Sequence, residues 1–449
     1  MNKPLHVVIL AAGAGTRMQS NKLKVLHQLA GLAMVDHVLQ LAQSLKPVQI
    51  TMVFGHQGEQ LIQHHQDQNV NWAEQKQQLG TGHAVQQAVK FFNEDEDVLV
   101  LYGDAPLVQN KDLANLQGQQ FVLTANLAEP TGYGRIIRSG KYIDAIVEQK
   151  DANPKQLAIQ EINSGIIQAP AKKLKLWLNQ LSNNNQQQEY YLTDVIGLAA
   201  KDGSPFIAVQ LDDADAVKGA NDMAQLAELE DIMQQRRRHE QMKKGVHLIH
   251  PQSVDIRGLL TCGKDVVVDK GVIFEGNNQL GNDVHIGAYS VIKNCQLASG
   301  TVIEPHSMLD QVVTTGACQI GPFARLRPGT KVADGCKIGN FVEIKKTQLG
   351  SNSKASHLSY LGDAIIGKDV NIGAGTITCN YDGVNKFTTE IKDGAFIGSD
   401  SQLVAPVVIG TNATIGAGST ITKDAPDEQL TLSRSRQRSV EHWQKPRKK

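Results

Sequence analysis

The sequence predicts a two-domain α/β protein, in which a doubly wound, Rossmann-like sheet is followed by a long helix and a parallel β-helix. Three observations support this prediction. Apolar runs alternate with helical stretches over the first half, a helix-forming segment follows, and an aliphatic residue then recurs every six positions between Asp265 and Asp424. The chain of 449 residues is longer than one hydrophobic core usually serves, and its 41% hydrophobic content is enough for two.

The first domain alternates between strands and helices. Apolar runs typical of buried strands cover residues 6–10, 49–54 and 98–102, and helical stretches lie around residues 35–44 and 83–91. This alternation is typical of a parallel sheet with helices on both faces. Ligands of such sheets gather at the carboxyl ends of the strands.

A single long helix is predicted to connect the domains. Its apolar residues recur at helical spacing, and they are Met223, Leu226, Leu229, Ile232 and Met233. The run Arg236-Arg237-Arg238 could bind phosphate, but we expect it to form a solvated helix face.

The six-residue period predicts coils of short strands. One register runs through Ile391, Ile397, Leu403, Ile409, Ile415 and Ile421. Gly often follows the aliphatic residue, which suggests a tight corner there. Each coil buries its aliphatic side chains only against the next coil. The spacing is similar to that of the left-handed β-helix of acyltransferases, in which three hexads make one coil of about 18 residues.

These patterns divide the chain into four expected segments. They are a first domain (1–222), a linker helix (223–244), a β-helix domain (245–432) and a basic tail (433–449).

Composition excludes several classes of protein. The 45 basic residues balance 45 acidic ones, so a surface that coats nucleic acid or membranes is not expected. No apolar run approaches the ~20 residues of a membrane span, and the N-terminal segment does not resemble a signal peptide, so we expect a cytoplasmic protein. Five cysteines without CxxC spacing argue against zinc ligands and disulfides. Cys318 and Cys336, 18 positions apart, should stack inside neighbouring coils.

The first strand is followed by a candidate phosphate-binding segment, LAAGAGTRM (residues 10–18), and then by Lys24. Glycines let the backbone approach phosphates, and Arg17 and Lys24 supply the positive charge that a triphosphate under attack requires. The dinucleotide fingerprint GxGxxG is not met, because Met18 replaces the third glycine. Asp104, at the end of a strand, is a natural Mg²⁺ ligand, although it could also be a turn or cap aspartate.

Further motifs extend this pattern along the chain. They are Gln75 with residues 79–82, residues 102–104, residues 131–135, Glu148, residues 163–165 and Asn221. The set resembles that of the sugar-1-phosphate nucleotidyltransferases. With the β-helix and the motif KASHLSYLGD (residues 354–363), essentially the whole chain resembles the bacterial family of bifunctional N-acetylglucosamine-1-phosphate uridyltransferases and glucosamine-1-phosphate N-acetyltransferases.

The resemblance implies two reactions. Acetyl-CoA would acetylate glucosamine 1-phosphate, and N-acetylglucosamine 1-phosphate would then attack the α-phosphorus of UTP, giving UDP-N-acetylglucosamine and pyrophosphate for peptidoglycan and lipopolysaccharide synthesis. Positioning and charge neutralisation would supply the catalysis of uridyl transfer. The family also implies a homotrimer with acetyltransferase sites between subunits.

The resemblance assigns residues to the uridyltransferase site. Arg17 and Lys24 would be catalytic, and Asp104 and Asn221 would coordinate Mg²⁺. UTP and the sugar nucleotide would be bound by Leu10, Ala11, Ala12, Gly13, Lys24, Gln75, Gly80, Thr81, Tyr102, Gly103, Asp104, Gly134, Glu148, Asn163 and Asn221. Ala14 departs from the family pattern, since many relatives carry a basic residue there, and this removes a phosphate contact.

Spacing alone suggests a second anion site. Arg327 and Lys345 are 18 positions apart, so they should project from one wall on coils ~4.8 Å apart. Two cations that close repel by up to ~3 kcal/mol at an effective dielectric of ~20, unless an anion lies between them. They could form a phosphate clamp, or they could splay into water. Ser399 and Ala417, also 18 apart, suit either a groove for a pantetheine arm or a plain corner.

The resemblance also assigns the acetyltransferase site. His357 would be the catalytic base that takes a proton from the amine, and we hypothesise that Glu343 orients it. Arg327, Lys345, Tyr360 and Asn371 would bind the sugar phosphate. Acetyl-CoA would contact Ala374, Asn380, Tyr381, Ser399, Ala417 and Arg434. Ser356 departs from the pattern, since relatives often have Gly beside the base. Residues 378–386 break the hexad register and predict a binding loop.

Three alternatives compete with this interpretation. A sugar-1-phosphate nucleotidyltransferase could carry a purely structural, trimerising β-helix, but such helices are shorter and lack the motif HLSYLGD. A zinc enzyme of the β-helix carbonic anhydrase type would need three histidines related by coil geometry, and His285, His306 and His357 do not have that spacing. A non-enzymatic scaffold would be unaffected by changes at Arg17 and His357.

Overall fold

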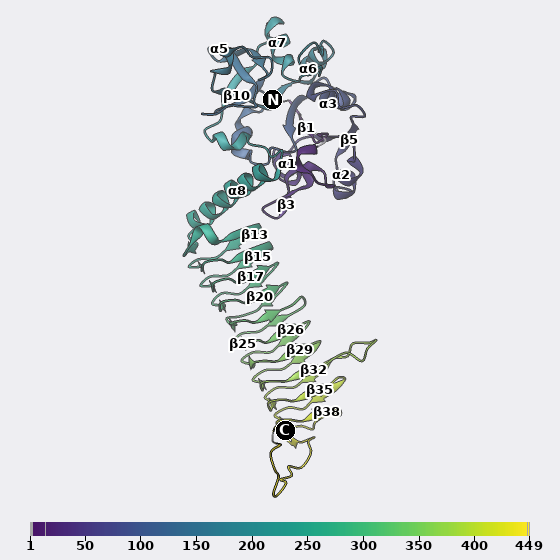
Figure 1. Ribbon diagram of the computed structural model, residues 1–449, viewed down its shortest axis with the longest axis vertical. Coiled ribbons are helices and arrows are strands. Elements are labelled where there is room, and N and C mark those ends of the chain that lie inside the picture. Colours follow the sequence, from purple (N-terminus) through teal and green to yellow (C-terminus); the bar gives the residue numbers. More distant parts are fainter. Residues whose placement is uncertain (1–2, 14, 447, 449) are drawn as a thin grey trace. The chain divides into compact units, whose positions relative to one another are not determined.

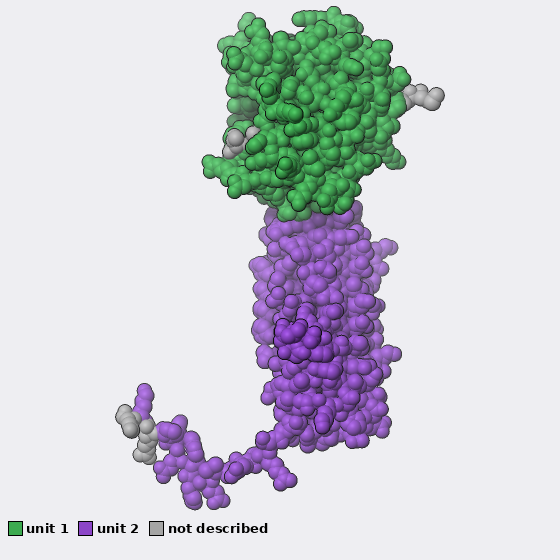
Figure 2. Space-filling view, turned by 90° about the vertical axis from the view of Figure 1, so that its right-hand side faces the viewer, with its two compact units in different colours: residues 1–233 green, residues 234–449 purple. Residues whose placement is uncertain are grey.

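The computed structural model describes residues 3–13, 15–446 and 448. It forms two compact units, residues 1–233 and residues 234–449 (Figure 2). Ala14, where the sequence departs from the family pattern, lies outside the described residues.

The core of the first unit is a nine-stranded sheet in the order β5-β4-β1-β6-β10-β7-β11-β9-β8. Strands β1, β4, β5 and β6 run parallel to one another. Their bounds are Leu5–Leu10, Gln49–Phe54, Asn71–Glu74 and Asp97–Tyr102. The three predicted strands are therefore confirmed, and their aliphatic side chains are almost fully buried.

The other half of this sheet contains antiparallel pairs. It comprises β7 (Phe121–Asn126), β8 (Arg135–Ser139), β9 (Tyr142–Val147), β10 (Glu161–Pro170) and β11 (Ile207–Gln210). Strand β10 is antiparallel to both β6 and β7, and β8 is antiparallel to β9. The predicted doubly wound fold is confirmed, but its parallel pairing is interrupted in this half, where only β11 and β7 pair in parallel. A short turn at Gly140 joins β8 to β9, and a connection that short permits only an antiparallel pair.

Helices surround the sheet of the first unit. The predicted helices are confirmed as α1 (Met34–Ser44) and α3 (Thr81–Ala88), the latter continued by a short 3₁₀ turn. The others in this unit are α2 (Gly58–His64), α4 (Asn110–Leu113), α5 (Pro154–Leu157), α6 (Ala171–Leu178) and α7 (Asp194–Lys201). Within the described residues, no helix is long and apolar enough to span a membrane.

A buried histidine makes this unit sensitive to acid. The His6 Nε2 atom lies 2.8 Å from Thr51 Oγ1, and the residue is fully buried. Burial lowers the pKa of His6 from 6.5 to about 4, and the Glu96 carboxylate offsets only part of that effect. The unfolded chain binds this proton more readily than the folded chain does. The contribution of neutral His6 to the free energy of unfolding should therefore be fully present above pH 6.5 and be lost as the pH falls towards 4.

We therefore predict that acid destabilises the wild-type protein more than a His6→Gln variant, whose side chain does not titrate. The difference should reach about 2 kcal/mol at pH 5, at 1.36 kcal/mol for each of the roughly 1.5 pH units below 6.5. Thermal unfolding of the full chain at pH 7 and pH 5 measures it. Equal losses of melting temperature in both proteins would contradict the prediction.

The predicted connecting helix is present as α8 (Met223–Lys243). Its first half packs in the first unit, where Leu229 is buried with Leu29, Met34 and Leu107. The expectation that its arginine run is a solvated face is wrong. Arg237 Nη1 donates to the Ile256 carbonyl oxygen at 2.6 Å, and Arg238 Nη1 donates to that of Val254 at 3.2 Å. Ile256 belongs to β13 (Asp255–Cys262), an edge strand whose outer carbonyl oxygens have no strand partner.

The second unit is a parallel β-helix that runs from β12 (His247–Leu248) to β39 (Leu430–Thr431), with coils stacked along its length (Figure 1). Its strands pair in parallel with the strands of the next coil, in sheets of 11 and 17 strands. Leu326 pairs with Ile344 and Ile344 with Leu361, so coils contain 18 or 17 residues. The hexad aliphatics form one continuous buried cluster along the helix.

The role predicted for the repeat glycines needs correction. Only Gly321 has a positive φ among the nine glycines that follow a repeat aliphatic, which are Gly281, Gly287, Gly321, Gly339, Gly367, Gly373, Gly398, Gly410 and Gly416. Lack of room for a side chain explains the other glycines better. A Cβ on Gly339, for example, would lie 2.0 Å from the Ser356 carbonyl oxygen on the next coil. Several left-handed corners instead carry side chains, among them Asp265 and Tyr289.

The stacking predicted for Cys318 and Cys336 is confirmed. All five cysteines are free, and Cys318 and Cys336 are buried in the β-helix core on neighbouring coils. Burial raises the pKa of the Cys318 thiol to about 12, so it stays protonated at neutral pH. Buried thiols of this kind are poor nucleophiles and poor metal ligands.

Candidate functional site

One pocket in the first unit collects most of the predicted uridyltransferase residues. It has a volume of about 320 Å³ and opens at the carboxyl ends of β1 and β6. Ten of the predicted residues line it: Leu10, Ala11, Ala12, Gly13, Lys24, Gln75, Gly80, Thr81, Tyr102 and Asp104. Its position agrees with the rule that ligands of doubly wound sheets bind at this edge.

The loop before α3 is held by hydrogen bonds of its own. Gln75 Nε2 donates to the Gly80 carbonyl oxygen at 3.0 Å. Gly80 has a φ of +108°, and a Cβ there would lie 2.6 Å from the Tyr190 carbonyl oxygen. Only glycine fits this position without strain. The loop therefore brings both Gln75 and Thr81 to the lining of the pocket.

Lys24 links the two predicted metal ligands. Its Nζ donates to Asp104 Oδ2 in a short ion pair, and to Asn221 Oδ1 at 2.8 Å. Two oxygen atoms thus converge on one cationic group. An arrangement of a carboxylate and an amide oxygen also fits a hard divalent cation, which takes oxygen ligands and completes its shell with water and phosphate.

The predicted sugar-binding residues lie along the antiparallel half of the sheet. The backbone N–H of Asn163 donates to the Gly134 carbonyl oxygen at 2.9 Å, and a Cβ on Gly134 would meet the Glu148 carboxylate. Thr193 Oγ1 donates to Glu148 Oε1 at 3.1 Å. Burial raises the pKa of the Glu148 carboxyl, and the hydrogen bond from Thr193 opposes this only in part.

Other predicted residues flank the pocket. Gly103 donates its N–H to the Leu10 carbonyl oxygen at 2.9 Å and so ties β6 to β1. Burial raises the pKa of the Tyr102 hydroxyl well above its usual range. Arg17 is exposed, in a short 3₁₀ turn, and is not among the residues that line the pocket in the described part of the chain.

Four lining residues were not predicted from the sequence. They are Val25, Gln78, Ala84 and Glu189. Gln78 Nε2 donates to the Ala12 carbonyl oxygen at 2.7 Å and so joins the two loops that form the pocket. Its position between Gln75 and Gly80 is the sequence signal that could have identified Gln78 as a pocket residue. Glu189 reaches the pocket from a distant loop, and no local pattern marks it.

In the β-helix, the two predicted phosphate-binding cations each have a carboxylate partner. Arg327 Nη1 donates to Glu343 Oε1 at 2.9 Å, and Lys345 Nζ lies 3.9 Å from Asp363 Oδ2. Arg327 follows β23 (Arg325–Leu326) and Lys345 ends β26 (Glu343–Lys345), on adjacent coils. The stacking predicted from the spacing of 18 is therefore confirmed.

His357 ends β28 (Lys354–His357) and is exposed beside a left-handed corner at Leu358. The chain then turns into β29 (Tyr360–Gly362), which places His357 and Tyr360 on either side of this corner. Asn371, in β31 (Asn371–Ile372), pairs with Lys354 on the coil before.

Among the residues that the structure describes, Glu343 makes no hydrogen bond to His357. Its carboxylate accepts from Arg327, and β26 and β28 belong to different sheets of the β-helix. The structure thus gives Glu343 a partner that differs from the one hypothesised.

The predicted acetyl-CoA residues lie on the last coils. The N–H of Gly418 donates to the Ser399 carbonyl oxygen at 2.8 Å, so Ser399 and Ala417 occupy neighbouring coils, and both are exposed. Arg434 Nη1 donates to the Ala417 carbonyl oxygen at 2.9 Å. Ala374 is half-buried at a corner, where its carbonyl oxygen accepts from Asp400 N at 2.7 Å.

The predicted loop leaves the coil as expected. Ile366 pairs with Ile391, 25 positions later, whereas coils that contain no such loop repeat after 16 to 18 residues. Asn380 is buried at its base and donates to the Asp363 carboxylate, and Tyr381 is exposed. Lys386 lies in the predicted loop but was given no role of its own. It approaches Lys345, and its ammonium group makes the loop a third source of positive charge. A hydrogen bond with Lys345 and repulsion from its charge lower the pKa of Lys386.

Fold and sites together define a nucleotidyltransferase joined to a hexapeptide-repeat transferase. Residues 7–130 match the MobA-like NTP transferase domain family, and residues 388–423 match the bacterial transferase hexapeptide family of six repeats. The Bifunctional protein GlmU of Idiomarina loihiensis is 52% identical over 451 residues, 99% of each chain. That of Stenotrophomonas maltophilia strain K279a is 52% identical over 454 residues, 100% of each chain, and that of Alkalilimnicola ehrlichii is 50% identical over 99% of this chain and 97% of its own.

The chain belongs to the bifunctional GlmU family. It is a bifunctional enzyme that acetylates glucosamine 1-phosphate with acetyl-CoA and transfers UMP from UTP to N-acetylglucosamine 1-phosphate, for cell-envelope synthesis. Uridyl transfer requires a divalent metal.

Proposed function

We propose that the pocket between residues 10–13 and residues 75–81 binds UTP, with the uracil near Gln75, Gly80 and Thr81 and the triphosphate near Lys24 and Arg17. The observation that carries this proposal is the convergence of these segments on one pocket at the carboxyl ends of β1 and β6. Gly134, Glu148 and Asn163 would hold the N-acetylglucosamine moiety, since the buried Glu148 carboxylate can accept hydrogen bonds from sugar hydroxyls.

The metal in this proposal is Mg²⁺, held by Asp104 and Asn221. The carboxylate and the amide oxygen fit a hard cation that keeps several waters and binds substrate phosphates. When bound, Mg²⁺ neutralises phosphate charge and orients the nucleotide. Lys24 already lies against both ligands, so it would shift towards the phosphates and add its own charge there.

In the β-helix we propose that Arg327, Lys345, Tyr360 and Asn371 bind glucosamine 1-phosphate, and that Lys386 adds to the phosphate clamp. His357 would accept the amine proton as the nitrogen attacks the thioester carbon of acetyl-CoA. Exposure at a corner leaves its ring accessible. Because Glu343 bonds to Arg327, we assign it the role of holding that guanidinium in place.

For acetyl-CoA we propose a groove past Ser399 and Ala417, lined by Ala374, Asn380 and Tyr381 and closed by Arg434. The small exposed residues on adjacent coils leave room for a thin pantetheine arm. Asn380 would act through its backbone or after release of Asp363, since its side-chain amide is engaged in this structure.

We propose that the protein is a homotrimer, as the family resemblance implies. Support comes from an aromatic ladder, here defined as Tyr289, His306, Phe323 and Phe341, whose rings stack at 4.9 to 5.4 Å between centroids. Phe341 is 61% exposed, and the next coil continues the ladder with Leu358, which is 62% exposed. A contiguous exposed apolar surface of this kind is typical of a protein interface.

Phe341→Lys should therefore weaken the trimer, because it buries an unpaired charge in the interface. Size-exclusion chromatography with light scattering would show a shift towards smaller species. The matched control is Leu176→Lys, since Leu176 is also exposed but lies on α6 in the first unit. A Phe341→Lys protein as large as wild type at every concentration would contradict the assignment.

We also propose a cytoplasmic location. All five cysteines are free, which fits a reducing compartment.

The proposed function is tested by two assays on one preparation of the wild-type protein. Release of the CoA thiol should require glucosamine 1-phosphate, and release of pyrophosphate from UTP should require N-acetylglucosamine 1-phosphate and Mg²⁺. If thiol release were absent while pyrophosphate release was present, the β-helix would be structural only.

A further inference from the structure

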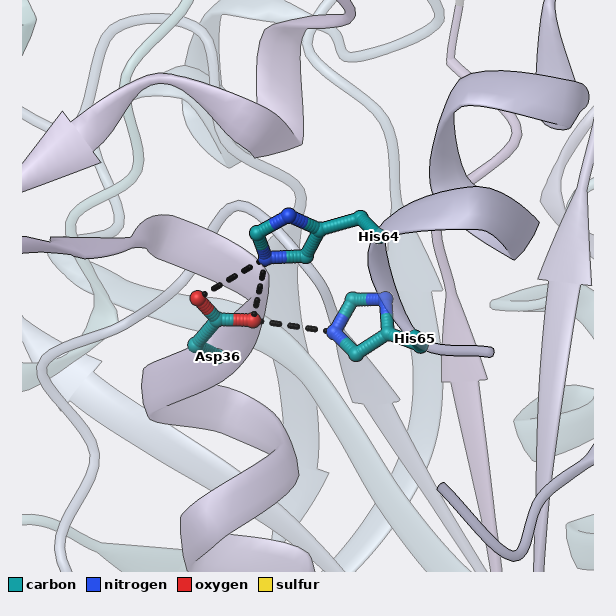
Figure 3. Close-up of side chains that lie close together, drawn as sticks. All are labelled: Asp36, His64 and His65. Atoms are coloured by element: carbon teal, nitrogen blue, oxygen red, sulfur yellow. Dashed lines mark hydrogen bonds and ion pairs between the residues drawn. The ribbon is translucent and has the colours of Figure 1, made fainter. Parts of the chain in front are cut away.

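A group of three metal-ligating side chains lies outside both sites. It consists of Asp36, His64 and His65, whose ligand atoms all lie within 4.8 Å of one another. Asp36 belongs to the first turn of α1, whereas His64 and His65 lie at the C-terminal end of α2 (Figure 3). None of the three lines the nucleotide pocket.

The distances from the two rings to the carboxylate are slightly shorter than those of a tetrahedral metal site. His64 Nε2 lies 3.1 Å from both Asp36 carboxylate oxygens, and His65 Nε2 lies 2.9 Å from Asp36 Oδ1. A tetrahedral zinc ion with ligands at about 2.0–2.1 Å separates its ligand atoms by about 3.3 Å. Both rings point their Nε2 atoms at the same carboxylate (Figure 3), so a small movement apart would admit the ion.

The hydrogen bonds of His65 favour a cation at this position. Its Nδ1 atom lies 3.1 Å from the Leu61 carbonyl oxygen, which can only accept, so Nδ1 carries the hydrogen. In the neutral ring, Nε2 then presents a lone pair to Asp36 Oδ1, and two acceptors face each other at 2.9 Å. A proton or a metal ion between them removes the conflict. Metal-bound histidines usually donate their other N–H to a carbonyl oxygen, as His65 does.

Burial gives the group one closed and one open side. The side chain of His65 is 3% exposed and that of Asp36 19%, whereas His64 is 42% exposed. Asp36 Oδ2 also accepts from the Ala33 N–H at 3.0 Å, which fixes the carboxylate at the start of α1. An ion could enter from the side of His64 and keep a water molecule as its fourth ligand.

We propose that Asp36, His64 and His65 form a binding site for a zinc-type divalent cation, separate from both catalytic sites, that fastens α1 to α2. Two imidazoles and one carboxylate suit borderline cations such as Zn²⁺, and they do not suit Mg²⁺, which prefers oxygen ligands. Cys262 and Cys295 offer little competition, since burial raises the pKa of each thiol to about 11.

The test is calorimetric titration of Zn²⁺ into the full-length protein after chelator treatment, with excess Mg²⁺ present throughout to occupy oxygen-ligand sites. Wild type should bind one Zn²⁺ per chain, and its melting temperature should rise on binding, because the ion binds only the folded state. His64→Ala should weaken binding by at least about tenfold.

His64 is the appropriate residue to change, since it is half-exposed and its loss leaves the fold intact, whereas His65 is buried. The matched control is His56→Ala, which removes an exposed imidazole just before α2 and should bind Zn²⁺ as wild type does. Circular dichroism confirms folding of both variants. Absence of Zn²⁺ binding, or equal binding by wild type and His64→Ala, would overturn the proposal.

Discussion

A His357→Ala variant is expected to lose acetyl transfer by about 10²- to 10⁴-fold, which is the usual contribution of a general base. Without the imidazole, the attacking amine must lose its proton to water. Uridyl transfer should stay at the wild-type rate, because its pocket lies in the other compact unit. The variant should fold normally, since His357 is exposed and exposed substitutions change stability by about 0.5 kcal/mol or less.

The measurement is release of the CoA thiol in the presence of glucosamine 1-phosphate. His285→Ala is the matched control, because His285 is also exposed and its strand β16 (His285–Ile286) belongs to the same sheet as β28. That control should be fully active. If His357→Ala kept more than about a tenth of the wild-type rate, His357 would not be the base.

An Asp104→Ala variant is expected to lose uridyl transfer by at least about a hundredfold, since a metal ion on a transferring phosphate contributes several kcal/mol and each 1.36 kcal/mol is a factor of ten. The change removes the carboxylate ligand. Of the two hydrogen-bond partners of Lys24, only Asn221 then remains. Pyrophosphate release measures the loss, and thiol release should not change.

Asp104→Asn separates charge from shape. The amide keeps an oxygen for Lys24 but lacks the negative charge that attracts the metal, so raising the Mg²⁺ concentration should restore part of the rate. A rate for Asp104→Asn equal to wild type at limiting Mg²⁺ would show that the metal binds elsewhere.

The period of the β-helix could be predicted because burial imposes it directly on the sequence. Leu326 and Ile344 occupy the same position on adjacent coils, as the spacing of 18 requires. The role of the repeat glycines could not be predicted, because the space beside Gly339 is set by Ser356 on another coil. The antiparallel half of the sheet was also missed, since strand direction depends on which strands meet and not on local pattern.

The residues of the candidate sites could likewise be predicted where they form a local motif, but not where distant segments meet. Gln75, Gly80 and Thr81 form a local motif, and the structure brings them to one pocket. By contrast, Glu343 was paired with His357 on chemical grounds, whereas its partner is Arg327. Glu189 and Lys386 approach their sites from loops whose paths no periodicity fixes. The Asp36–His64–His65 group was invisible for the same reason, because its members come from two helices.

The central claim is that one chain carries two independent transferase sites, and a mixing experiment tests it most directly. UDP-N-acetylglucosamine formation is measured from glucosamine 1-phosphate, acetyl-CoA and UTP with His357→Ala, Asp104→Ala and an equal mixture of both. We predict that neither variant alone makes the product at more than a small fraction of the wild-type rate. The mixture should restore it, because N-acetylglucosamine 1-phosphate made by one protein is used by the other. Full product formation by His357→Ala alone, or no restoration on mixing, would contradict the account.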